Sequence, residues 1–232
     1  ITPQGLAGGG MVPGPGEISL AHHGVLFLDE LAEFRRETLE ILRQPMEEHC
    51  VKLARLAGNY EFPSDFMLVA AMNPCRCGYY PDLNRCHCTK GMVEQYLKKI
   101  SQPLLDRIDI CVETKRVEYQ DLIKENPHQE TSAEIRKRVV AAMERQQQRF
   151  AGTNIRYNSR IPAALLTKYC RLSTKQKQYM ESIYQKLELT ARSYHRILRV
   201  ARTIADMDGS DEILTRHLSA VSYTHLTLPT IR

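Results

Sequence analysis

The sequence predicts an α/β domain followed by a smaller domain made of helices alone. Three short apolar runs without polar alternation, at 24–28, 66–72 and 108–112, are typical of strands buried on both faces of a parallel sheet. After about Val117 such runs stop, and the sequence up to Leu218 consists of helical segments. We therefore expect an α/β domain at 1–120, a helical domain at 121–221 and an extraneous, disordered tail at 222–232.

The first half of the α/β domain begins with a stretch rich in Gly and Pro. Residues 1–16 should form turns or a hairpin rather than a helix. The strand at 24–28 comes next. Leucines and a phenylalanine then recur at helical spacing over 31–42, so we expect one helix there, with Pro45 just beyond its end.

The second half of this domain begins with a mixed segment at 51–62. A turn signal at Gly58-Asn59 predicts a short hairpin. The second strand at 66–72 is followed by a long loop rich in cysteine, a helix at 92–100 and the third strand at 108–112.

The helical domain is divided by Gly, Asn, Pro, Ser and Thr residues. Thr190 and Ser210 are residue types that cap helix N-termini, and we expect them to do so here. The predicted helical segments lie near 131–150, 162–171, 174–188, 191–206 and 210–220.

Composition excludes several classes of protein. Of the 232 residues 43% are hydrophobic and 25% are charged, which is ordinary for a globular protein. The apolar stretches fall far short of the roughly 20 residues that span a bilayer, and no secretory signal is visible. Seven cysteines, an odd number, argue against a secreted disulfide scaffold. We expect a cytoplasmic protein that makes no membrane contact.

The positive charge is concentrated in one region. The net charge is +5, and residues 131–171 hold nine Lys or Arg against two Asp or Glu. This excess suits a polyanionic partner such as nucleic acid. A solvated helix surface without a partner is the other interpretation.

The sharpest chemical motif is the apolar run 25–28 followed by Asp29 and Glu30. It places two carboxylates at the carboxyl end of a buried parallel strand, where ligands of open α/β sheets bind. Asp29 can hold Mg²⁺ bound to a nucleotide, and Glu30 can orient and deprotonate the attacking water. The alternative is an acidic first helical turn after a strand end.

Two further positions suit phosphate chemistry. Asn73 follows the second strand, and its amide could hold the attacking water or touch the γ-phosphate, although Asn-Pro is also a common turn. Arg107 precedes the third predicted strand and could act as an arginine finger across a subunit boundary. A surface arginine paired with Asp106 or Asp109 is the alternative.

A basic helix is predicted after Thr190. Arg192, Arg196 and Arg199 lie at i, i+4 and i+7, which places them on one face. Arg192, in the first turn, could contact the γ-phosphate. A basic amphipathic helix with a solvated face is the alternative.

The order of these motifs resembles that of AAA+ ATPases, which carry Walker B, sensor 1, an arginine finger and sensor 2 in this sequence. Gly-Val-Leu-Phe-Leu-Asp-Glu-Leu, Ala-Ala-Met-Asn-Pro-Cys, Leu-Leu-Asp-Arg-Ile-Asp and Arg-Ser-Tyr-His-Arg-Ile-Leu-Arg-Val-Ala-Arg are similar to segments of the magnesium-chelatase family, in its YifB/ComM-like branch. The resemblance covers about residues 5–221.

The resemblance implies a partial parallel sheet of the P-loop type, a helical lid, ATP and Mg²⁺ as cofactors and a homohexameric ring. Hairpins that line the central pore in related motors would correspond to segments around 8–20 and 50–62. The implied roles are Mg²⁺ coordination by Asp29, catalytic base for Glu30, sensor 1 for Asn73, finger for Arg107 and sensor 2 for Arg192.

A cysteine cluster occupies the loop after Asn73. Cys75 and Cys77 form one C-x-C pair, and Cys86 and Cys88 form another after eight residues. Thiolates suit tetrahedral Zn²⁺, and His87 is a spare ligand. Reduced packing cysteines and a redox disulfide are the alternatives, and similar cysteines in the resembling family favour zinc.

The sequence departs from that family at both ends. It contains no Walker A loop, G-x-x-x-x-G-K-S/T, whose lysine and amides cradle phosphates. The family's N-terminal domain, which resembles the Lon protease C-terminal domain, is also missing. We expect a truncation before residue 1 and weak or no ATP binding by this chain. Residues 223–232 do not resemble the family's terminus.

Three functions follow from these motifs. The first is an ATP-driven ring motor acting on DNA in competence or recombination. The second is a protein or metal-insertion remodeller like the magnesium chelatase ATPase subunit, and the third is a non-catalytic binding module. A basic hairpin at 50–62, which carries Lys52 and Arg55, would favour DNA, and an acidic or apolar one would favour a protein client.

Overall fold

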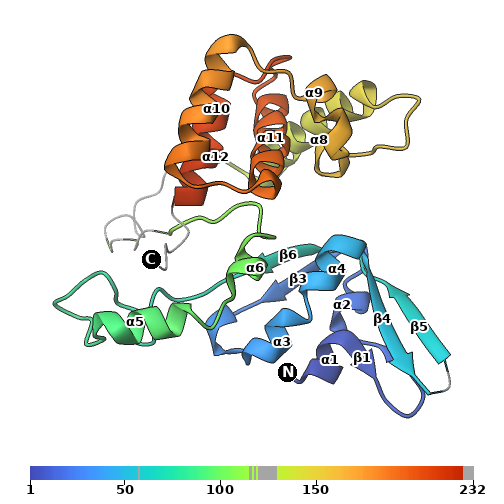
Figure 1. Ribbon diagram of the computed structural model, residues 1–232, viewed down its shortest axis with the longest axis vertical. Coiled ribbons are helices and arrows are strands. Elements are labelled where there is room, and N and C mark those ends of the chain that lie inside the picture. Colours follow the sequence, from blue (N-terminus) through green and yellow to red (C-terminus); the bar gives the residue numbers. More distant parts are fainter. Residues whose placement is uncertain (57, 115–116, 118, 120–129, 227–232) are drawn as a thin grey trace. The chain divides into compact units, whose positions relative to one another are not determined.

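The computed structural model divides the chain into two units, one comprising Ile1–Ile108 and the other beginning at Asp109 (Figure 1). It describes residues 1–56, 58–114, 117, 119 and 130–226, and for 222–226 the backbone alone. The predicted boundary at 120/121 falls among residues outside this description. An α/β part followed by a helical part is confirmed.

The prediction that residues 1–16 form no helix is wrong, because unit 1 begins with a short helix. Helix α1 (Pro3–Ala7) forms because Thr2 accepts a hydrogen bond from the Gly5 amide at 3.1 Å and Pro3 occupies the first turn. The predicted hairpin follows, since β1 (Gly8–Gly9) pairs antiparallel with β2 (Gly14–Pro15). A Cβ on Gly8, at φ +98°, would lie 2.3 Å from the Gly14 carbonyl oxygen, so the turn requires glycine there. Helix α2 (Glu17–Leu20) completes this segment.

The sheet that carries the motifs joins β3 (Val25–Leu28) to β6 (Met67–Ala70) in parallel. Leu26 and Leu28 are buried, whereas Phe27 is 59% exposed. The prediction of burial on both faces is therefore wrong, because within the described residues this sheet has two strands and is covered on one face.

The third predicted strand, at 108–112, is also not formed. The described residues of that segment pair with no strand, and Ile110 and Val112 are exposed. Apolar character alone does not form a strand when no neighbouring backbone offers hydrogen bonds.

The predicted helix over 31–42 is broken into shorter pieces. They are the 3₁₀ turn η1 (Leu31–Glu33), α3 (Arg36–Glu40) and α4 (Arg43–Glu48). Pro45 lies inside the first turn of α4 rather than beyond the helix, because the amide that proline lacks has no intrahelical partner at that position.

A second hairpin is confirmed, with β4 (Cys50–Arg55) antiparallel to β5 (Gly58–Pro63). Gly58 already pairs with Arg55, so the predicted turn at Gly58-Asn59 lies too late. Figure 1 shows the two strands side by side and extending away from β3 and β6.

The rest of unit 1 is a long cysteine-bearing loop and two helices. Helix α5 (Lys90–Leu97) begins where the Thr89 hydroxyl accepts the Met92 amide at 3.3 Å. Helix α6 (Gln102–Leu105) is capped by Ser101 in the same way.

The regular elements in the described residues of unit 2 are all helices, as predicted for 121–221. Capping boxes formed by Thr131 with Glu134, and by Ser173 with Gln176, begin two of its helices. The elements are α8 (Ser132–Arg149), η2 (Asn158–Arg160), η3 (Ala163–Leu165), α9 (Leu166–Tyr169), α10 (Thr174–Lys186), α11 (Ala191–Met207) and α12 (Thr215–Leu226).

Two predictions near the end of unit 2 are wrong. Ser210 does not begin a helix, because its hydroxyl donates to the Glu212 carbonyl and α12 begins at Thr215. Helix α12 runs to Leu226, so the tail predicted at 222–232 is helical over its first five residues, and the part at 227–232 lies outside the described residues. None of the helices in the described part of the chain is long and apolar enough to cross a membrane.

A buried polar network joins three elements of unit 2. The Asp206 carboxylate on α11 is fully buried and accepts hydrogen bonds from Arg149 at 2.7 Å and from Asn158 at 2.8 Å. Arg202, one turn earlier on α11, lies 3.1 Å from the same carboxylate. Each buried charge is thus paired and hydrogen-bonded, as burial requires.

Candidate functional site

The two predicted carboxylates lie directly beyond the end of β3. Asp29 accepts the Glu30 amide at 2.8 Å, and Glu30 has a left-handed backbone with φ 49°. This bend turns the chain out of the strand into η1, and the Leu31 amide then donates to the Ala71 carbonyl at 2.9 Å. Both carboxylates are exposed.

Asn73 lies at the same edge of the sheet. The Leu28–Ala70 pair ends the ladder, and the Ala71 amide donates to the Leu28 carbonyl at 2.9 Å. Because β3 and β6 are parallel, their carboxyl ends coincide, and Asn73 follows β6 by three residues with its side chain exposed. The structure thus brings Asp29, Glu30 and Asn73 to one edge.

This edge fits a hydrated divalent cation. Asp29 and Glu30 form no ion pair with any residue that the structure describes, so their charge is uncompensated there. Carboxylate and amide oxygens are the ligands that Mg²⁺ prefers. This edge lacks the backbone amides and lysine of a Walker A loop, which would bind the phosphates, since the 232 residues contain no Walker A motif.

Arg107 is held inside unit 1. Its Nη2 atom lies 2.8 Å from Glu47 Oε1, and Nη1 donates to the Pro103 carbonyl. The side chain is 11% exposed. Sequence reasoning did not find Glu47, because the two residues are far apart in the chain and α4 brings them together only in the fold.

Helix α11 places Arg192, Arg196 and Arg199 in three different environments. Thr190 caps the helix as predicted, accepting the Ser193 amide at 3.2 Å, and Arg192 is exposed in the first turn. Arg196 is buried, with Nε 4.0 Å from Asp109, and Arg199 donates twice to the Ile161 carbonyl at 3.0 and 2.7 Å. The alternative of one solvated basic face is therefore wrong.

The carboxyl group of Asp109 is affected by this arrangement. Partial desolvation beside α11 raises its pKa although 62% of the side chain is exposed, and the positive charges of Arg196 and Arg199 oppose that rise. Asp109 thus belongs to the structure of unit 2, where it lies against α11.

Part of the basic excess at 131–171 is neutralised within unit 2. Arg149 is bound by Asp206 in the network described above. Arg138 lies 2.6 Å from Glu130, and Arg145 lies 3.3 Å from Asp211. The positive surface is therefore smaller than the residue count indicates.

The four clustered cysteines meet in space. Sulfur–sulfur distances are 3.3 Å for Cys75–Cys77, 3.7 Å for Cys75–Cys86 and 3.5 Å for both Cys77–Cys86 and Cys77–Cys88. All four sulfur atoms lie within 4.8 Å of one another, and His87 is not part of the group. They are free thiols, so the disulfide alternative is absent from this structure.

The four thiols do not ionise alike. The Tyr79 amide lowers the pKa of Cys77 to about 6, helped by the neighbouring thiols. The Cys88 amide lowers that of Cys86, but burial and the thiols of Cys77 and Cys75 outweigh it and raise the pKa to about 12. Thiolates this close repel one another unless a cation lies among them.

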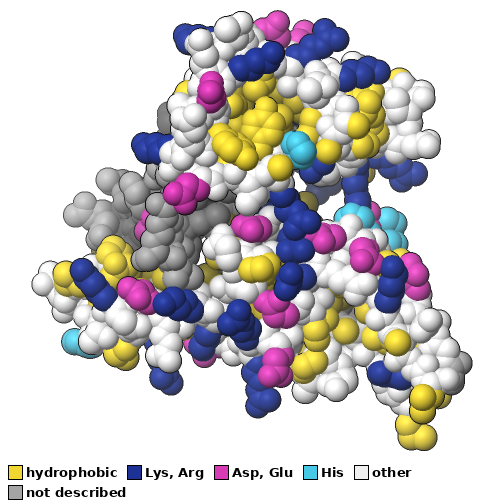
Figure 2. Space-filling model, in the orientation of Figure 1, with side chains coloured by type: hydrophobic (Ala, Val, Ile, Leu, Met, Phe, Trp, Pro, Cys, Tyr) yellow, Lys and Arg dark blue, Asp and Glu magenta, His cyan; other side chains and the backbone are white. Residues whose placement is uncertain are grey.

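The two hairpins of unit 1 lie next to each other. A Cβ on Gly9 would lie 3.2 Å from Arg55 Nη2. Their ends carry the exposed apolar side chains of Met11, Val12 and Leu56, and Figure 2 shows hydrophobic atoms gathered at this end of the unit.

The basic side chains of β4 are partly compensated. Lys52 lies 2.7 Å from Glu48 and opposite Glu61 on β5. Arg55 donates to the Ala54 carbonyl at 3.3 Å. The hairpin is thus mixed in charge and apolar at its tip.

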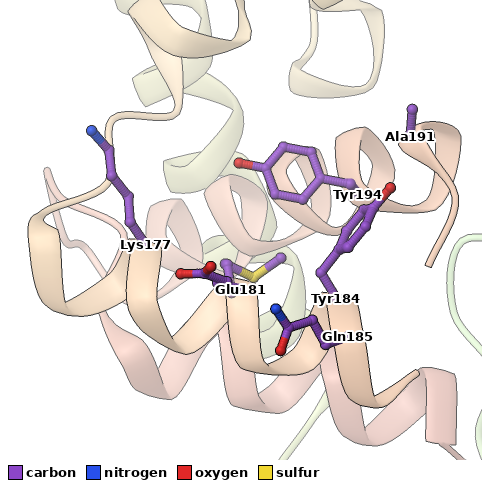
Figure 3. A pocket seen from close by; sticks show the side chains of 7 residues that line it. Lys177, Glu181, Tyr184, Gln185, Ala191 and Tyr194 are labelled. Carbon is purple, nitrogen blue, oxygen red and sulfur yellow. The ribbon is translucent and has the colours of Figure 1, made fainter. Parts of the chain in front are cut away.

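A pocket in unit 2 lies between α10 and α11 (Figure 3). The rings of Tyr184 and Tyr194 meet edge to face, with centroids 6.2 Å apart. None of the predicted site residues lines it, although Ala191 directly precedes Arg192. The lining residues are Lys177, Met180, Glu181, Tyr184, Gln185, Ala191 and Tyr194.

The chain is similar to known proteins along most of its length. Residues 1–122 match the family model of magnesium chelatase, subunit ChlI, and residues 129–224 match that of its C-terminal part. The chain is 43% identical over 219 residues to the uncharacterized protein YifB of Escherichia coli, covering 94% of this chain and 42% of that protein.

Two other relatives are similar over nearly the same region. Identity to the competence protein ComM of Haemophilus influenzae is 41% over 214 residues, with 92% of this chain and 41% of that protein covered. Identity to the uncharacterized protein Mb2921c of Mycobacterium bovis is 36% over 204 residues, with 88% and 40% covered. The chain therefore spans about two-fifths of the length of these relatives.

Proposed function

The chain belongs to the magnesium-chelatase ChlI family, in the branch of YifB and ComM, and we propose that the protein carrying this sequence is an ATP-hydrolysing ring motor. The observation that carries the proposal is the placement of Asp29, Glu30 and Asn73 at one carboxyl edge of the β3–β6 sheet. Ligands of parallel sheets bind at this edge.

Each residue at the edge has one role in the proposal. Asp29 holds Mg²⁺ on the nucleotide, and the ion, when bound, neutralises charge on the phosphates. Glu30 accepts a proton from the attacking water. Asn73 orients that water through its amide, a neutral group that takes no proton.

Two arginines complete the proposed site in an assembled ring, which we propose to be a homohexamer. Arg107 is the finger that acts on the nucleotide of a neighbouring subunit, and this requires its release from Glu47. Arg192 is the sensor 2 residue, and its exposure in the first turn of α11 supports that choice.

Nucleotide affinity is expected to depend on residues that this sequence does not contain. The phosphate-cradling amides and lysine of a Walker A loop are not found in the 232 residues. We expect weak or no ATP binding by this chain alone, and a fluorescent-nucleotide titration with tight, Mg²⁺-dependent binding would contradict this.

We propose DNA as the client. The basic excess at 131–171 supports it, and so does the name of the Haemophilus relative, a competence protein. A protein client is the second candidate, because Leu56, Met11 and Val12 are exposed at the hairpin ends. A metal-insertion role like that of the magnesium chelatase ATPase subunit belongs to the same second class.

The hydrolytic role is tested with Glu30→Gln in the protein that carries this sequence. Loss of the base should lower ATP turnover by about 10²- to 10⁴-fold while Mg²⁺-dependent nucleotide binding is retained. Glu37→Gln, an exposed glutamate at the start of α3, is the matched control and should leave turnover unchanged. Equal turnover in wild type and Glu30→Gln would refute the proposal.

The client is tested by measuring turnover with single- and double-stranded DNA. Stimulation by either supports DNA. If neither changes turnover, DNA is not the client. Leu56→Ser should then be used to ask whether a protein client depends on the hairpin tip.

We also propose Zn²⁺ as the ion of the cysteine loop. A tetrahedral site with Zn–S bonds of about 2.3 Å has sulfur atoms roughly 3.8 Å apart, close to the distances seen here. Four protein thiolates leave no open position, which is typical of a structural rather than a catalytic ion.

A further inference from the structure

The cysteine loop and α5 share one very small core. Cys75, Cys86 and Val93 are buried together, with Cys77, Cys88 and Leu97 packed against them. Between Cys75 and Thr89 the structure has no helix or strand. So few apolar contacts do not by themselves stabilise a loop of this length, and small folds usually add a metal or a disulfide.

This core is attached to Asn73 at one end. Pro74 alone separates Asn73 from Cys75, and the Gly78 amide donates to the Cys75 carbonyl at 3.0 Å. A Cβ on Gly78 would lie 3.9 Å from Asn73 Cγ, so the loop folds back alongside the Asn73 side chain. The position of Asn73 therefore depends on the turn that Cys75 begins.

At the end of α5, the same core is connected to the segment that follows Glu30. Lys99, just beyond α5, donates to the Ala32 carbonyl at 2.8 Å and lies 3.7 Å from the Glu33 carboxylate. Ala32 is fully buried. Because Lys99 and Ala32 are 67 residues apart, this contact exists only while α5 is held in place.

We infer that a metal ion bound by the four cysteines braces the catalytic edge, holding Asn73 through the loop and the Asp29–Glu30 segment through α5 and Lys99. The catalytic meaning of the brace rests on the proposed ATPase function, whereas the brace itself does not. In this inference the cysteines and Lys99 are positioning residues, since none of them touches the reacting atoms.

The metal is tested first, by elemental analysis of the chain purified under reducing conditions with zinc present. One zinc per chain is expected, and Cys75→Ser and Cys86→Ser should each lose it. Cys111→Ser removes a thiol outside the cluster and should keep it. Cobalt in place of zinc should give the absorption of a tetrahedral thiolate site. A metal-free wild type, or zinc retained by both Cys75→Ser and Cys86→Ser, overturns the inference.

The brace is tested by amide hydrogen exchange without nucleotide, so that failure of the ATPase proposal leaves this result readable. Removal of the metal by a chelator should speed exchange of the Leu31 and Glu33 amides, which are hydrogen-bonded here, and of the Gly78 amide. The β4–β5 hairpin should be unchanged. No change at Leu31 and Glu33 would show that the loop is a separate structure.

A second variant avoids any unfolding caused by cysteine loss. Lys99→Met keeps the apolar stem and removes the donor to Ala32. Exchange of the Leu31 and Glu33 amides should rise about fivefold or more, as expected for loss of one charge-assisted hydrogen bond. Zinc content should remain one per chain. Unchanged exchange at these amides would remove Lys99 from the brace.

Discussion

Arg107 and Glu47 are joined by an ion pair, with Nη2 2.8 Å from Oε1 and the Arg107 side chain 11% exposed. Arg107, which we propose to act on a neighbouring subunit, is thus paired with a residue of its own chain. In the proposed ring, release of this pair would be part of the cost of assembly, and the pair itself can be tested in the isolated chain.

Glu47→Gln should destabilise unit 1 by about 1–3 kcal/mol, because a largely buried guanidinium loses its charged partner. Glu48→Gln is the control. Its partner Lys52 and Glu48 itself are both about half exposed, so the loss of stability should be clearly smaller than for Glu47→Gln. Native-state hydrogen exchange of amides in unit 1 measures the loss of stability in both variants. Equal effects would mean that the Arg107 pair is an ordinary surface pair.

Asp206→Asn should destabilise unit 2 by about 3–5 kcal/mol. It leaves Arg202, 3% exposed, and Arg149 without their shared carboxylate. Asp211→Asn removes an aspartate that is 98% exposed beside Arg145 and should cost less than about 1 kcal/mol. Urea unfolding, monitored by hydrogen exchange of α11 amides, distinguishes the two variants. Similar urea midpoints for Asp206→Asn and Asp211→Asn would count against the network.

Thr190→Ala should destabilise α11 by about 1 kcal/mol, since the Ser193 amide loses its hydrogen bond to the cap. Ser210→Ala should have an effect within about 0.5 kcal/mol, because Ser210 caps no helix. Thermal unfolding of unit 2 checks both. A larger loss for Ser210→Ala would reverse the assignment of caps.

Acid should loosen the first turn of α8. The Thr131 amide donates to the Glu134 carboxylate at 2.7 Å and, with the Thr131 hydroxyl, holds the pKa of Glu134 below its ordinary value of 4.5. Since the pKa is lower in the folded state, this stabilisation is complete above 4.5 and is lost as the pH falls through the lowered value. Chemical shifts of Thr131 and Ile135 should follow this transition, and Glu134→Gln should abolish it.

Local sequence signals identified the residues that the structure brings to one edge of the β3–β6 sheet. Asp29, Glu30 and Asn73 were identified because each follows an apolar run, and both of these runs form strands. Thr190 was found because capping depends on residues three apart. Both signals are contained in a few neighbouring positions.

Contacts between distant parts of the chain were not predictable in this way. The pairs Arg107–Glu47 and Arg149–Asp206 depend on how helices pack, and nothing in the local sequence marks the partner. The prediction of a third strand at 108–112 was wrong for a similar reason. Ile110 and Val112 are residue types common in strands, but a strand forms only where a neighbouring backbone pairs with it.

The open face of the β3–β6 pair has a practical consequence for purified samples. Phe27 and Val69 are partners in register, and with Val25 and Met67 they present adjoining apolar side chains to water. Such faces drive reversible self-association, and sulfate or phosphate strengthens it because these salts favour apolar burial. The light scattering of a concentrated solution should therefore rise with added sulfate, and Phe27→Ser should reduce that rise.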